Sequence, residues 1–188
     1  MKIDYVVMGH ISRKEYFPYL KKQLGSRTQF SVDNGSLGLW ANCRRAWSMI
    51  NPAADYGFVV QDDAILADNF KTKVKQFVTQ HPGFAYSLFF GDRLSSRKIY
   101  EHHEHDDHIR FKFLMWGLAV GLPQAHIKPM VKFGDNYPEQ TPDDRRIKEY
   151  LTVARLDTVY PLPCLVDHRD DVSIVDPSKP VRKAVRFT

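Results

Sequence analysis

The sequence predicts a single α/β domain in which helices flank a mostly parallel central sheet. Strand-like and helix-like stretches alternate over the first half of the chain, the order typical of parallel strands joined by helices. The chain has 188 residues, which suits one domain large enough to bury a core. Hydrophobic residues make up 43% of it, and no low-complexity tract interrupts it. This composition excludes a chain that is disordered throughout.

The expected strands are short runs of apolar, β-branched and aromatic residues bounded by turn signals. The first starts at Ile3, and the second ends at the turn sequence Asp33-Asn34-Gly35. The third is a hydrophobic run that leads directly into two acids. In chain order, strands are expected at residues 3–8, 28–32, 56–60, 84–90, 111–121 and within 158–166.

The expected helices have apolar residues at helical spacing and recognisable ends. Ser12 is expected to cap the first helix and Gly25 to end it. Trp40 and Trp47 are one heptad apart and share a helix face, so both are expected in the core. Asp68 is expected to cap the helix that follows the third strand. In chain order, helices are expected at residues 13–24, 37–50, 69–80, 123–133 and 141–153.

Charge, cysteine content and hydropathy narrow the class of protein. No apolar stretch approaches the ~18–20 residues of a membrane-spanning helix, and the start of the sequence lacks a signal-peptide pattern, so a cytoplasmic protein is expected. Cys43 and Cys164 are too few for a disulfide framework and are expected to be reduced core residues. The formal net charge of +5 and the pI of about 9.1 give a mild bias toward phosphorylated or nucleic-acid ligands.

Two adjacent acids, Asp62 and Asp63, directly follow the third expected strand. Ligands of open α/β sheets bind beyond the carboxyl ends of the strands, so chemistry is expected here. Adjacent carboxylates repel each other unless a cation or hydrogen-bond donors lie between them. A divalent ion such as Mg²⁺ or Mn²⁺, bridging to a diphosphate, would meet that need because both ions prefer oxygen ligands. The alternative is a turn followed by a helix cap.

The sequence around these acids resembles a known family. Residues 60–66, Val-Gln-Asp-Asp-Ala-Ile-Leu, followed by Asn69-Phe70, look like the Asp-x-Asp region of GT-A-fold glycosyltransferases. More narrowly, they are similar to the Glu-Asp-Asp form of lipopolysaccharide-type, family-2-like transferases. The resemblance implies a Rossmann-like GT-A fold whose acids hold the metal that carries the diphosphate of a nucleotide sugar. Gln61 replaces the acid usually found first, so the metal would rest on Asp62 and Asp63.

A second stretch, residues 165–173, resembles the end of the same catalytic domain. Many such enzymes carry a late histidine that completes the metal site, which here would be His168. Imidazole suits Mn²⁺ better than Mg²⁺, so Mn²⁺ is the expected ion. A histidine in a polar loop is the alternative. The resemblance spans roughly residues 1–175, the expected catalytic domain, and leaves residues 176–188 as a basic C-terminal tail.

The same resemblance implies where the sugar donor would bind. Asp33, at the end of the second strand, would contact the uracil or ribose of a UDP-sugar. Residues 34–36 after it would suit a backbone anion nest, but a simple turn explains them equally well. Asn42 and Arg45 lie on the helix expected to pack beneath the donor, from which they would reach a nucleotide phosphate. Asp62 would contribute to the same donor site through the metal.

An acidic pair opens the last expected helix. The sequence Thr141-Pro142-Asp143-Asp144 makes a good helix N-terminus without any catalytic role. In inverting members of the family, the second acid of such a pair is the general base that deprotonates the acceptor hydroxyl. By that resemblance, Asp144 would be the base and Asp143 its neighbour. The sequence leaves inversion or retention open.

Three other features allow both a structural and a functional interpretation. Trp116 either stacks on an acceptor sugar or is buried in a strand. Residues 101–108 hold four histidines among four acids, which suits Zn²⁺ or Ni²⁺, but a solvated, mobile loop is favoured. Arg182, Lys183 and Arg186 form a basic tail that is either frayed or contacts phosphates.

These observations predict a metal-dependent glycosyltransferase that uses a nucleotide-diphosphate sugar, with UDP the expected nucleotide, and an acceptor hydroxyl. The acceptor would be a glycan or a hydroxylated DNA base, the latter as in virus-encoded transferases that act in the host cytoplasm. A nucleotidyltransferase is one alternative, although residues 8–13 make a poor phosphate-binding loop. A non-catalytic nucleic-acid-binding protein is the other. The sequence identifies neither the sugar nor the oligomeric state.

Overall fold

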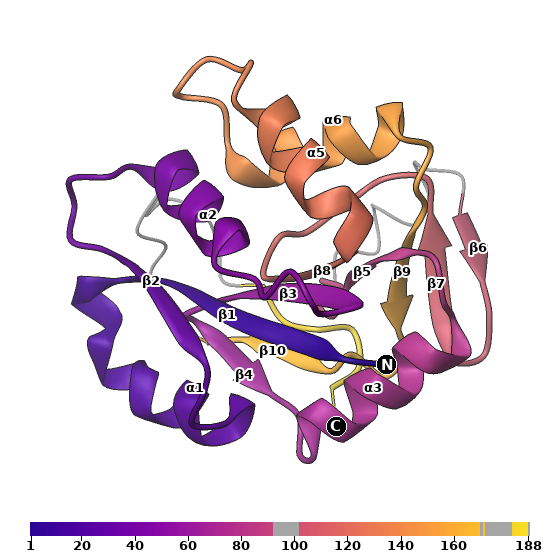
Figure 1. Cartoon of the computed structure of the whole chain (residues 1–188). Coiled ribbons are helices and arrows are strands. Elements are labelled where there is room, and N and C mark those ends of the chain that lie inside the picture. The colour runs from indigo at the N-terminus through magenta and orange to yellow at the C-terminus, as the bar shows by residue number, and fades with distance from the viewer. Residues whose placement is uncertain (92–101, 170, 172–181, 188) are drawn as a thin grey trace.

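A computed structural model describes residues 1–91, 102–169, 171 and 182–187 of the chain. These residues form an eight-stranded sheet and a separate two-stranded sheet (Figure 1). In spatial order, the strands of the large sheet are β2 (Gln29–Asp33), β1 (Ile3–His10), β3 (Tyr56–Gln61), β8 (Ala119–Pro123), β5 (Ala85–Ser87), β9 (Thr158–Pro161), β7 (His108–Phe111) and β6 (His102–Glu104). The small sheet consists of β10 (Val166–His168) and β4 (Ala64–Leu66).

The large sheet is mostly parallel, as predicted. β1 pairs in parallel with both β2 and β3, and β5 pairs in parallel with β9. β8 runs antiparallel to its neighbours β3 and β5, and β7 runs antiparallel to β9 and β6. Within the described residues, six strands of this sheet therefore point one way, while β8 and β7 oppose them.

Helices cover both faces of the large sheet (Figure 1). On one face lie α1 (Phe17–Leu24), which follows the 3₁₀ helix η1 (Ile11–Tyr16), and α3 (Phe70–Gln80). On the other face lie α2 (Leu39–Ser48), α5 (Gln124–Gly134) and α6 (Asp143–Val153). This order of helix, sheet and helix layers confirms the predicted α/β fold.

The core divides into two hydrophobic clusters, one on each side of the sheet. In β1, Tyr5 and Val7 pack with α1 and α3, whereas Val6 and Met8 pack with α2, α5 and α6. The alternation follows from strand geometry, since successive side chains point to opposite faces. Both clusters receive residues from the same central strands, so β1 and β3 are buried on both faces. Their carboxyl ends are therefore held rigidly, which matters for any site built on them.

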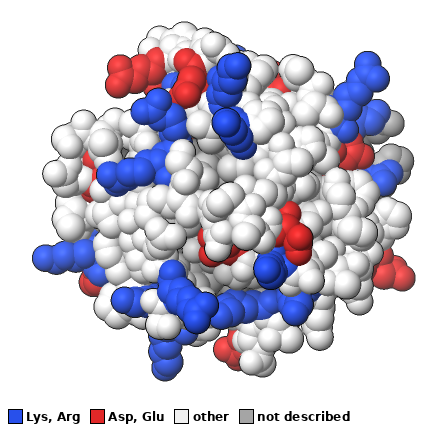
Figure 2. Space-filling model, viewed as in Figure 1, with Lys and Arg blue, Asp and Glu red and all other residues white. Residues whose placement is uncertain are grey.

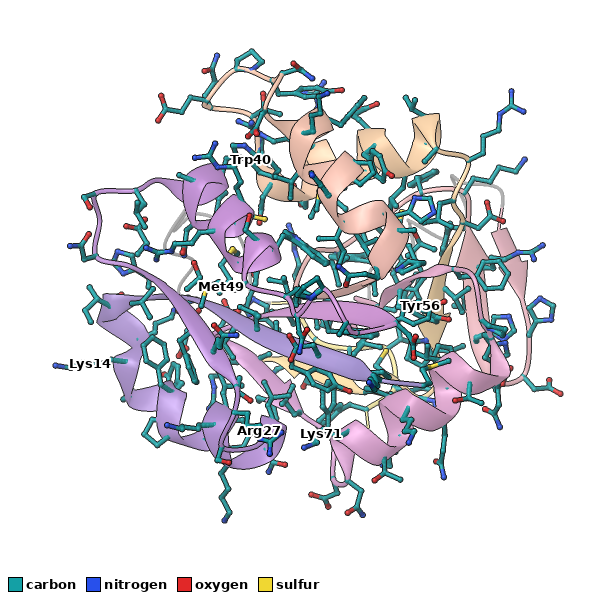
Figure 3. All side chains as sticks on the ribbon, in the orientation of Figure 1. Lys14, Arg27, Trp40, Met49, Tyr56 and Lys71 are labelled. Atoms are coloured by element: carbon teal, nitrogen blue, oxygen red, sulfur yellow. The ribbon has the colours of Figure 1, made fainter. Side chains whose placement is uncertain are left out.

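The two tryptophans of α2 are buried, as predicted. Trp47 is 1% exposed, and Trp40 is 8% exposed. Figure 3 shows Trp40 lying on the side of α2 that faces the α5–α6 layer. A Cβ at Gly134 would lie 2.3 Å from the Trp40 ring, so only glycine allows the end of α5 to approach it. The indole Nε1 donates to Asp135 at 2.9 Å, which satisfies the one polar atom of this side chain.

The first helix differs from the prediction at its start. Residues 11–16 form η1, and the α-helix begins only at Phe17. Pro18 has no amide hydrogen to donate, so an α-helix that begins at residue 13 cannot continue unbroken through it. The cap also differs, because the His10 side chain accepts from the Ser12 amide. Likewise Asn69, in a left-handed conformation, precedes α3 in place of the expected Asp68 cap.

Two long expected strands are each divided into two short ones. The expected strand at 111–121 becomes β7 and β8, because one end pairs with β9 and the other lies between β3 and β5. The expected strand within 158–166 becomes β9 and β10, which belong to different sheets. The expected strand at 84–90 shortens to β5. Periodicity cannot locate these divisions, because they depend on which partner each end finds.

The histidine-rich segment is also more ordered than predicted. Instead of a mobile loop, residues 102–104 and 108–111 form the β6–β7 hairpin, and Glu101 lies outside the described residues. The predicted burial of both cysteines is confirmed, and Cys43 and Cys164 are unpaired. None of the helices in the described part of the chain combines the length and hydrophobicity needed to span a bilayer.

Candidate functional site

The parallel pairing of β1 and β3 places their carboxyl ends side by side, and the two acids follow β3 there. The backbone amide of His10 donates to Asp62 Oδ2 at 2.6 Å. A Cβ at Gly9 would lie 3.1 Å from the same oxygen and 2.9 Å from the Phe17 ring. The glycine therefore lets the end of β1 approach the carboxylate closely. Burial raises the pKa of Asp62 and the His10 amide opposes this rise.

A cation lies between the two acids, as the repulsion argument requires. Nη1 of Arg13, in η1, is 3.1 Å from Asp62 Oδ1 and 2.6 Å from Asp63 Oδ2. Only 11% of the Arg13 side chain is exposed, and the two carboxylates are buried as well. Arg13 was not among the predicted site residues. The signal that could have identified it is its position, because a cation about one turn after the first strand lies beside the strand that carries the acids.

The two-stranded sheet brings His168 to the acids across a long sequence separation. In the β10–β4 ladder, His168 pairs with Ala64, the residue after Asp63. His168 Nε2 lies 3.4 Å from Asp63 Oδ2, and the Arg169 amide donates to the Asp63 carbonyl at 3.0 Å. Of the three residues predicted to bind metal, Asp63 and His168 are thus in contact. Asp62 is joined to Asp63 through Arg13.

These residues have the atoms needed to bind a divalent cation. Asp63 Oδ1 is buried and has no hydrogen-bond partner within the described residues, and such an orphaned acceptor is rare unless a ligand satisfies it. His168 Nδ1 donates to the Arg169 carbonyl at 2.6 Å, the arrangement that fixes Nε2 as the metal-binding nitrogen in many sites. Carboxylate and imidazole donors are of a kind that suits Mn²⁺, although one ligand atom from each of the three residues does not lie within 4.8 Å of the other two in this arrangement. A cation bound there would compete with the Arg13 guanidinium for the same oxygens.

The acidic pair at the start of α6 separates into one buried and one partly exposed side chain. Asp143 is 7% exposed, and burial, with Asp144 adding to it, raises its pKa to about 6. Its carboxylate accepts from the thiol of Cys43, a residue of α2. Asp144 instead lies against Gly117, which also adjoins the side chain of Gln61 at the end of β3. The position that a Cβ at Gly117 would take is 3.1 Å from Asp144 Cβ and 3.9 Å from Gln61 Nε2.

The residues predicted to bind the nucleotide form hydrogen bonds within the protein. Asp33 Oδ1 accepts from the amides of Gly35, Ser36 and Leu37 at 2.8, 3.1 and 3.0 Å. Burial raises the pKa of Asp33, but these amides outweigh it, and the result is a lowered pKa. The amides of this segment thus bind the Asp33 side chain, which corresponds to the turn interpretation of residues 34–36. The carboxylate nevertheless lies at the end of β2, in the same row of strand ends as Asp62.

Asn42 and Arg45 connect α2 to the ends of β1 and β2. Asn42 Nδ2 donates to the Gly9 carbonyl at 3.0 Å, and its Oδ1 accepts from Ser31 Oγ at 2.6 Å. Arg45 donates to Ser31 Oγ at 2.8 Å and to the Val32 carbonyl at 2.6 Å. In this arrangement both side chains position the strand ends that surround the acids.

Trp116 is buried, so of the two interpretations left open for it, burial holds and stacking on a sugar does not, although the residue lies in a loop and not in a strand. It is 7% exposed and packs edge-on against Phe90 at 4.8 Å and against Phe89 and Tyr160 at longer distances. The loop that carries it turns into the core because these aromatic rings provide a large apolar surface. Its neighbour Gly117, rather than Trp116, faces Asp144.

The described part of the basic tail packs against the body of the protein. Lys183 Nζ donates to the His168 carbonyl at 3.0 Å, and the Ala184 amide donates to Asp167 at 2.8 Å. The Val185 amide donates to the Phe90 carbonyl. Residues 182–187 thus contact β10. The interpretation of a frayed end is therefore wrong for this part of the tail. Arg182 precedes these contacts, and residues 172–181 lie outside the described residues.

Comparison with known proteins yields fold-level similarities. No protein-family model matches the chain, and a search of curated proteins finds no match. The fold is similar to that of a UDP-glucose pyrophosphorylase complexed with UDP-glucose (11% identity, TM-score 0.49, 85% of this chain and 73% of that one). HddC from Yersinia pseudotuberculosis matches at 12% identity and a TM-score of 0.42, over 77% of this chain and 84% of its own.

A third solved structure is a putative glucose-1-phosphate thymidylyltransferase from Bacillus anthracis, in complex with a sucrose. It is 13% identical with a TM-score of 0.44, and the match covers 83% of this chain and 65% of that one. At these identities and TM-scores the similarity describes the fold alone and assigns no reaction to the chain. The function must therefore be argued from the residues of the site.

Proposed function

We propose that this protein is a metal-dependent glycosyltransferase that transfers a sugar from a nucleotide-diphosphate sugar to an acceptor hydroxyl. The observation that carries the proposal is the position of Asp144. Its Cβ and the Gln61 amide nitrogen both lie within 4 Å of the Cβ position of Gly117, and Gln61 directly precedes Asp62. One strand end is therefore flanked by an acidic pair that suits a cation and by a separate carboxylate that suits a general base.

Each group of residues would have its own role in the reaction. Asp62, Asp63 and His168 would hold Mn²⁺ or Mg²⁺, which neutralises the charge that develops on a departing diphosphate. Arg13 holds the same two acids in the structure, and the metal would displace it from their oxygens. Asp144 would accept the proton of the acceptor hydroxyl while the new carbon–oxygen bond forms and the bond from the sugar to the diphosphate breaks. The nucleotide diphosphate leaves with the electron pair of that bond.

The order of the strands supports a donor that extends across β3, β1 and β2. These strands are neighbours, and Asp62, His10 and Asp33 mark their carboxyl ends. A diphosphate at Asp62 would place the nucleoside toward Asp33, with UDP the expected nucleotide. Asn42 and Arg45 would contribute indirectly, because their hydrogen bonds to the carbonyls of Gly9 and Val32 hold the backbone of the strand ends in place. The acceptor would approach from the side of Asp144.

A nucleotidyltransferase is a second candidate, and the observation that favours it is Arg13. A cation directly after the first strand, in contact with the metal-binding acids, is suited to hold the pyrophosphate of a nucleoside triphosphate. In that reaction a sugar phosphate attacks the α-phosphorus and pyrophosphate leaves. No acceptor hydroxyl has to lose a proton, so Asp144 would have no catalytic role.

The experiment that separates these functions measures the products released from nucleotide sugars. UDP-, GDP-, CDP- and ADP-sugars are incubated with the protein and Mn²⁺, Mg²⁺ or EDTA, with and without added pyrophosphate. A glycosyltransferase releases the nucleoside diphosphate by slow donor hydrolysis in the presence of the metal. A nucleotidyltransferase instead forms the nucleoside triphosphate and sugar 1-phosphate when pyrophosphate is added.

Matched variants assign the activity to the site. Asp63→Asn should abolish either reaction, whereas Asp68→Asn changes an exposed acid five residues away and should leave it intact. Nucleic-acid binding that persists in EDTA, without any nucleotide-sugar turnover, would contradict both enzymatic functions and support the non-catalytic alternative.

A further inference from the structure

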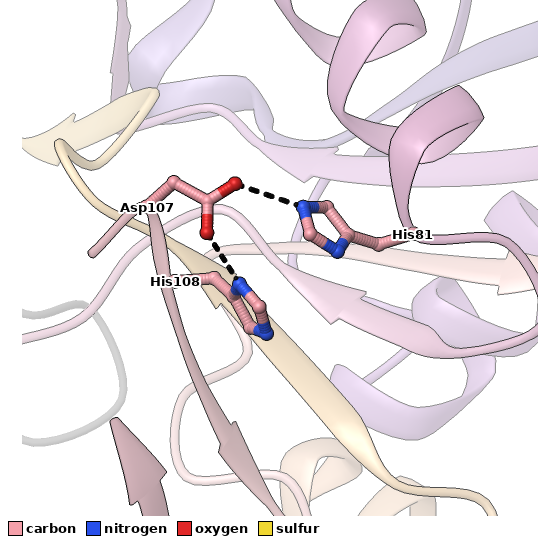
Figure 4. A group of neighbouring side chains, drawn as sticks. All are labelled: His81, Asp107 and His108. Atoms are coloured by element: carbon pink, nitrogen blue, oxygen red, sulfur yellow. Dashed lines mark hydrogen bonds and ion pairs between the residues drawn. The ribbon is translucent and has the colours of Figure 1, made fainter. Parts of the chain in front are cut away.

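We propose that His81, Asp107 and His108 form a second metal site, of the kind that binds Zn²⁺, on the opposite half of the sheet from Asp62 and Asp63 (Figure 4). His81 Nε2 lies 3.0 Å from Asp107 Oδ2, and His108 Nδ1 lies 2.7 Å from Asp107 Oδ1. One ligand atom from each of the three residues lies within 4.8 Å of the others. The proposal does not depend on the glycosyltransferase function.

Two elements that are already fixed by backbone hydrogen bonds, the end of α3 and the β6–β7 hairpin, bring these side chains together. His81 ends α3, and its amide donates to the Phe77 carbonyl. Asp107 precedes β7, and its carbonyl accepts from the Leu162 amide at 2.8 Å. His108 opens β7 and pairs with Pro161 of β9. His108 thus lies in a strand, and His81 and Asp107 directly adjoin a helix and a strand, which hold a site more precisely than long loops do.

The two imidazoles are oriented by packing. The Phe77 ring contacts both of them, at 4.8 Å from His81 and 6.4 Å from His108 between ring centroids. The two imidazoles are 4.3 Å apart, and their side chains are only 18% and 12% exposed. Because both rings pack against Phe77, one nitrogen of each faces Asp107, as Figure 4 shows.

The donor atoms match the chemistry of zinc. Two imidazoles and one carboxylate are a common set of three zinc ligands, with water or a further side chain in fourth place. Bonds of about 2.0 Å in a tetrahedral site hold the ligand atoms roughly 3.3 Å apart, a few tenths of an ångström more than the two present contacts. The Asp107 side chain is 57% exposed, so it can rotate by this amount without disturbing the core.

A fourth ligand is available in the same hairpin. The His105 ring stacks on His108 with centroids 4.3 Å apart, and the side chain is exposed. The His105 amide donates to the His108 carbonyl at 2.8 Å, which closes the turn between β6 and β7. A bound Zn²⁺ would tie this edge hairpin to the end of α3, because its ligands come from both.

The test uses Zn²⁺ as the probe and protein without a histidine tag. The background is Asp63→Asn, so that the acidic site does not contribute. After treatment with EDTA and reloading, this protein should hold one zinc per chain, and added Zn²⁺ should raise its Tm, since a ligand that binds only the folded state stabilises it. Co²⁺ in place of Zn²⁺ should give the visible absorption of a tetrahedral site.

His81→Gln, His108→Gln and Asp107→Asn should each lose the zinc, the Tm shift and the Co²⁺ absorption. His126→Gln, a histidine of α5 on the other face, should retain all three. Asp107 is exposed, so its variant should fold, and the Tm of each variant in EDTA verifies this. Zinc retained by both His81→Gln and Asp107→Asn would overturn the proposal and leave these residues as a simple ion-pair cluster.

Discussion

Arg13 and Asp63 form a 2.6 Å ion pair that joins the segment after β1 to the end of β3. The same guanidinium nitrogen contacts Asp62, so one buried cation lies between two buried carboxylates and offsets part of their charge. Removing one partner from such a buried cluster leaves a charge without compensation, which costs far more than losing a surface pair. The acidic pair therefore depends either on Arg13 or on a bound cation.

The first prediction follows from this dependence. In EDTA, Arg13→Met should lower the free energy of unfolding by about 3 kcal/mol, because Asp62 and Asp63 then repel each other in a buried position. Mn²⁺ should restore more stability to the variant than it adds to the wild type, since the guanidinium no longer competes with it. Urea unfolding with Mn²⁺ and with EDTA measures both effects.

Arg44→Met is the matched control for that prediction. Arg44 forms an exposed ion pair with Asp135 at 3.6 Å, and surface pairs of this kind contribute less than about 1 kcal/mol. Its loss should be small and independent of Mn²⁺. An equal Mn²⁺ effect on wild type and Arg13→Met would show that the metal and the guanidinium do not share the acids.

The second prediction concerns Asp143 and pH. Burial raises the pKa of Asp143 from 3.8 to about 6 in the folded protein. Between these two values the folded state binds more protons than the unfolded state, so stability should fall as pH rises from about 4 to about 6 and then level off. Two pKa units correspond to a loss of about 3 kcal/mol at most.

Asp143→Asn removes this titration and keeps the shape of the side chain. The free energy of unfolding of the variant, measured in urea across pH 4 to 8, should exceed that of the wild type above pH 6 and converge with it toward pH 4. Asp68→Asn, an exposed acid, should follow the wild-type curve. Parallel curves for wild type and Asp143→Asn would mean that Asp143 is not destabilised by burial.

The third prediction tests Asp144 without changing it. A methyl group at Gly117 would lie 3.1 Å from Asp144 Cβ, so Gly117→Ala should displace the carboxylate by a few tenths of an ångström. If Asp144 is the base, the rate of glycosyl transfer should fall by about tenfold while donor binding stays unchanged, because only the proton acceptor moves. Calorimetry with the nucleotide sugar and a rate assay separate the two.

Gly117→Ala must also fold normally for this result to count, so its Tm should be compared with that of the wild type. Asp144→Asn should lose more activity than Gly117→Ala, again with unchanged donor affinity. An unaltered rate in both variants would remove Asp144 from the mechanism and favour the nucleotidyltransferase.

The sequence predicted the fold well because its strongest signals are local. Hydrophobic runs such as residues 3–8 and 56–60 predict central strands. Because Asp62 and Asp63 directly follow the second of these runs, their position at the carboxyl edge of the sheet could be predicted correctly. The burial of Trp40 and Trp47 followed from their spacing. Each of these features depends on a few neighbouring residues, which a single sequence displays.

The long-range contacts of the site could not be predicted in this way. Arg13 reaches the acids only because β1 and β3 are neighbours, and His81 meets His108 only because α3 ends beside β7. For Trp116 the sequence left burial and contact with a sugar equally open, and only the surrounding aromatic rings decide between them. Such contacts depend on strand order and on loop paths, which periodicity does not encode.

The fourth prediction concerns the acceptor. Lys and Arg gather along the lower edge of the molecule in Figure 2, over α1 and the start of α3. Figure 3 shows Arg27 and Lys71 in the lower part of the molecule and Lys14 at its left side, and Lys21 and Lys22 of α1 are exposed as well. A basic edge of this kind attracts the phosphates of nucleic acid. We therefore expect retention on heparin and binding to duplex DNA that weaken steeply with salt.

Replacing Lys14, Lys21 and Lys22 with Gln should reduce the slope of log Kd against log salt by about 2 to 3, since each phosphate contact contributes nearly one unit. The control replaces Lys128 and Lys132 of α5, which are exposed on the other helix layer, and should leave the slope unchanged. If both sets of variants bind DNA like the wild type, the lower edge is a solvated surface. A glycan would then be the acceptor to test, because its hydroxyl needs Asp144 and no basic edge.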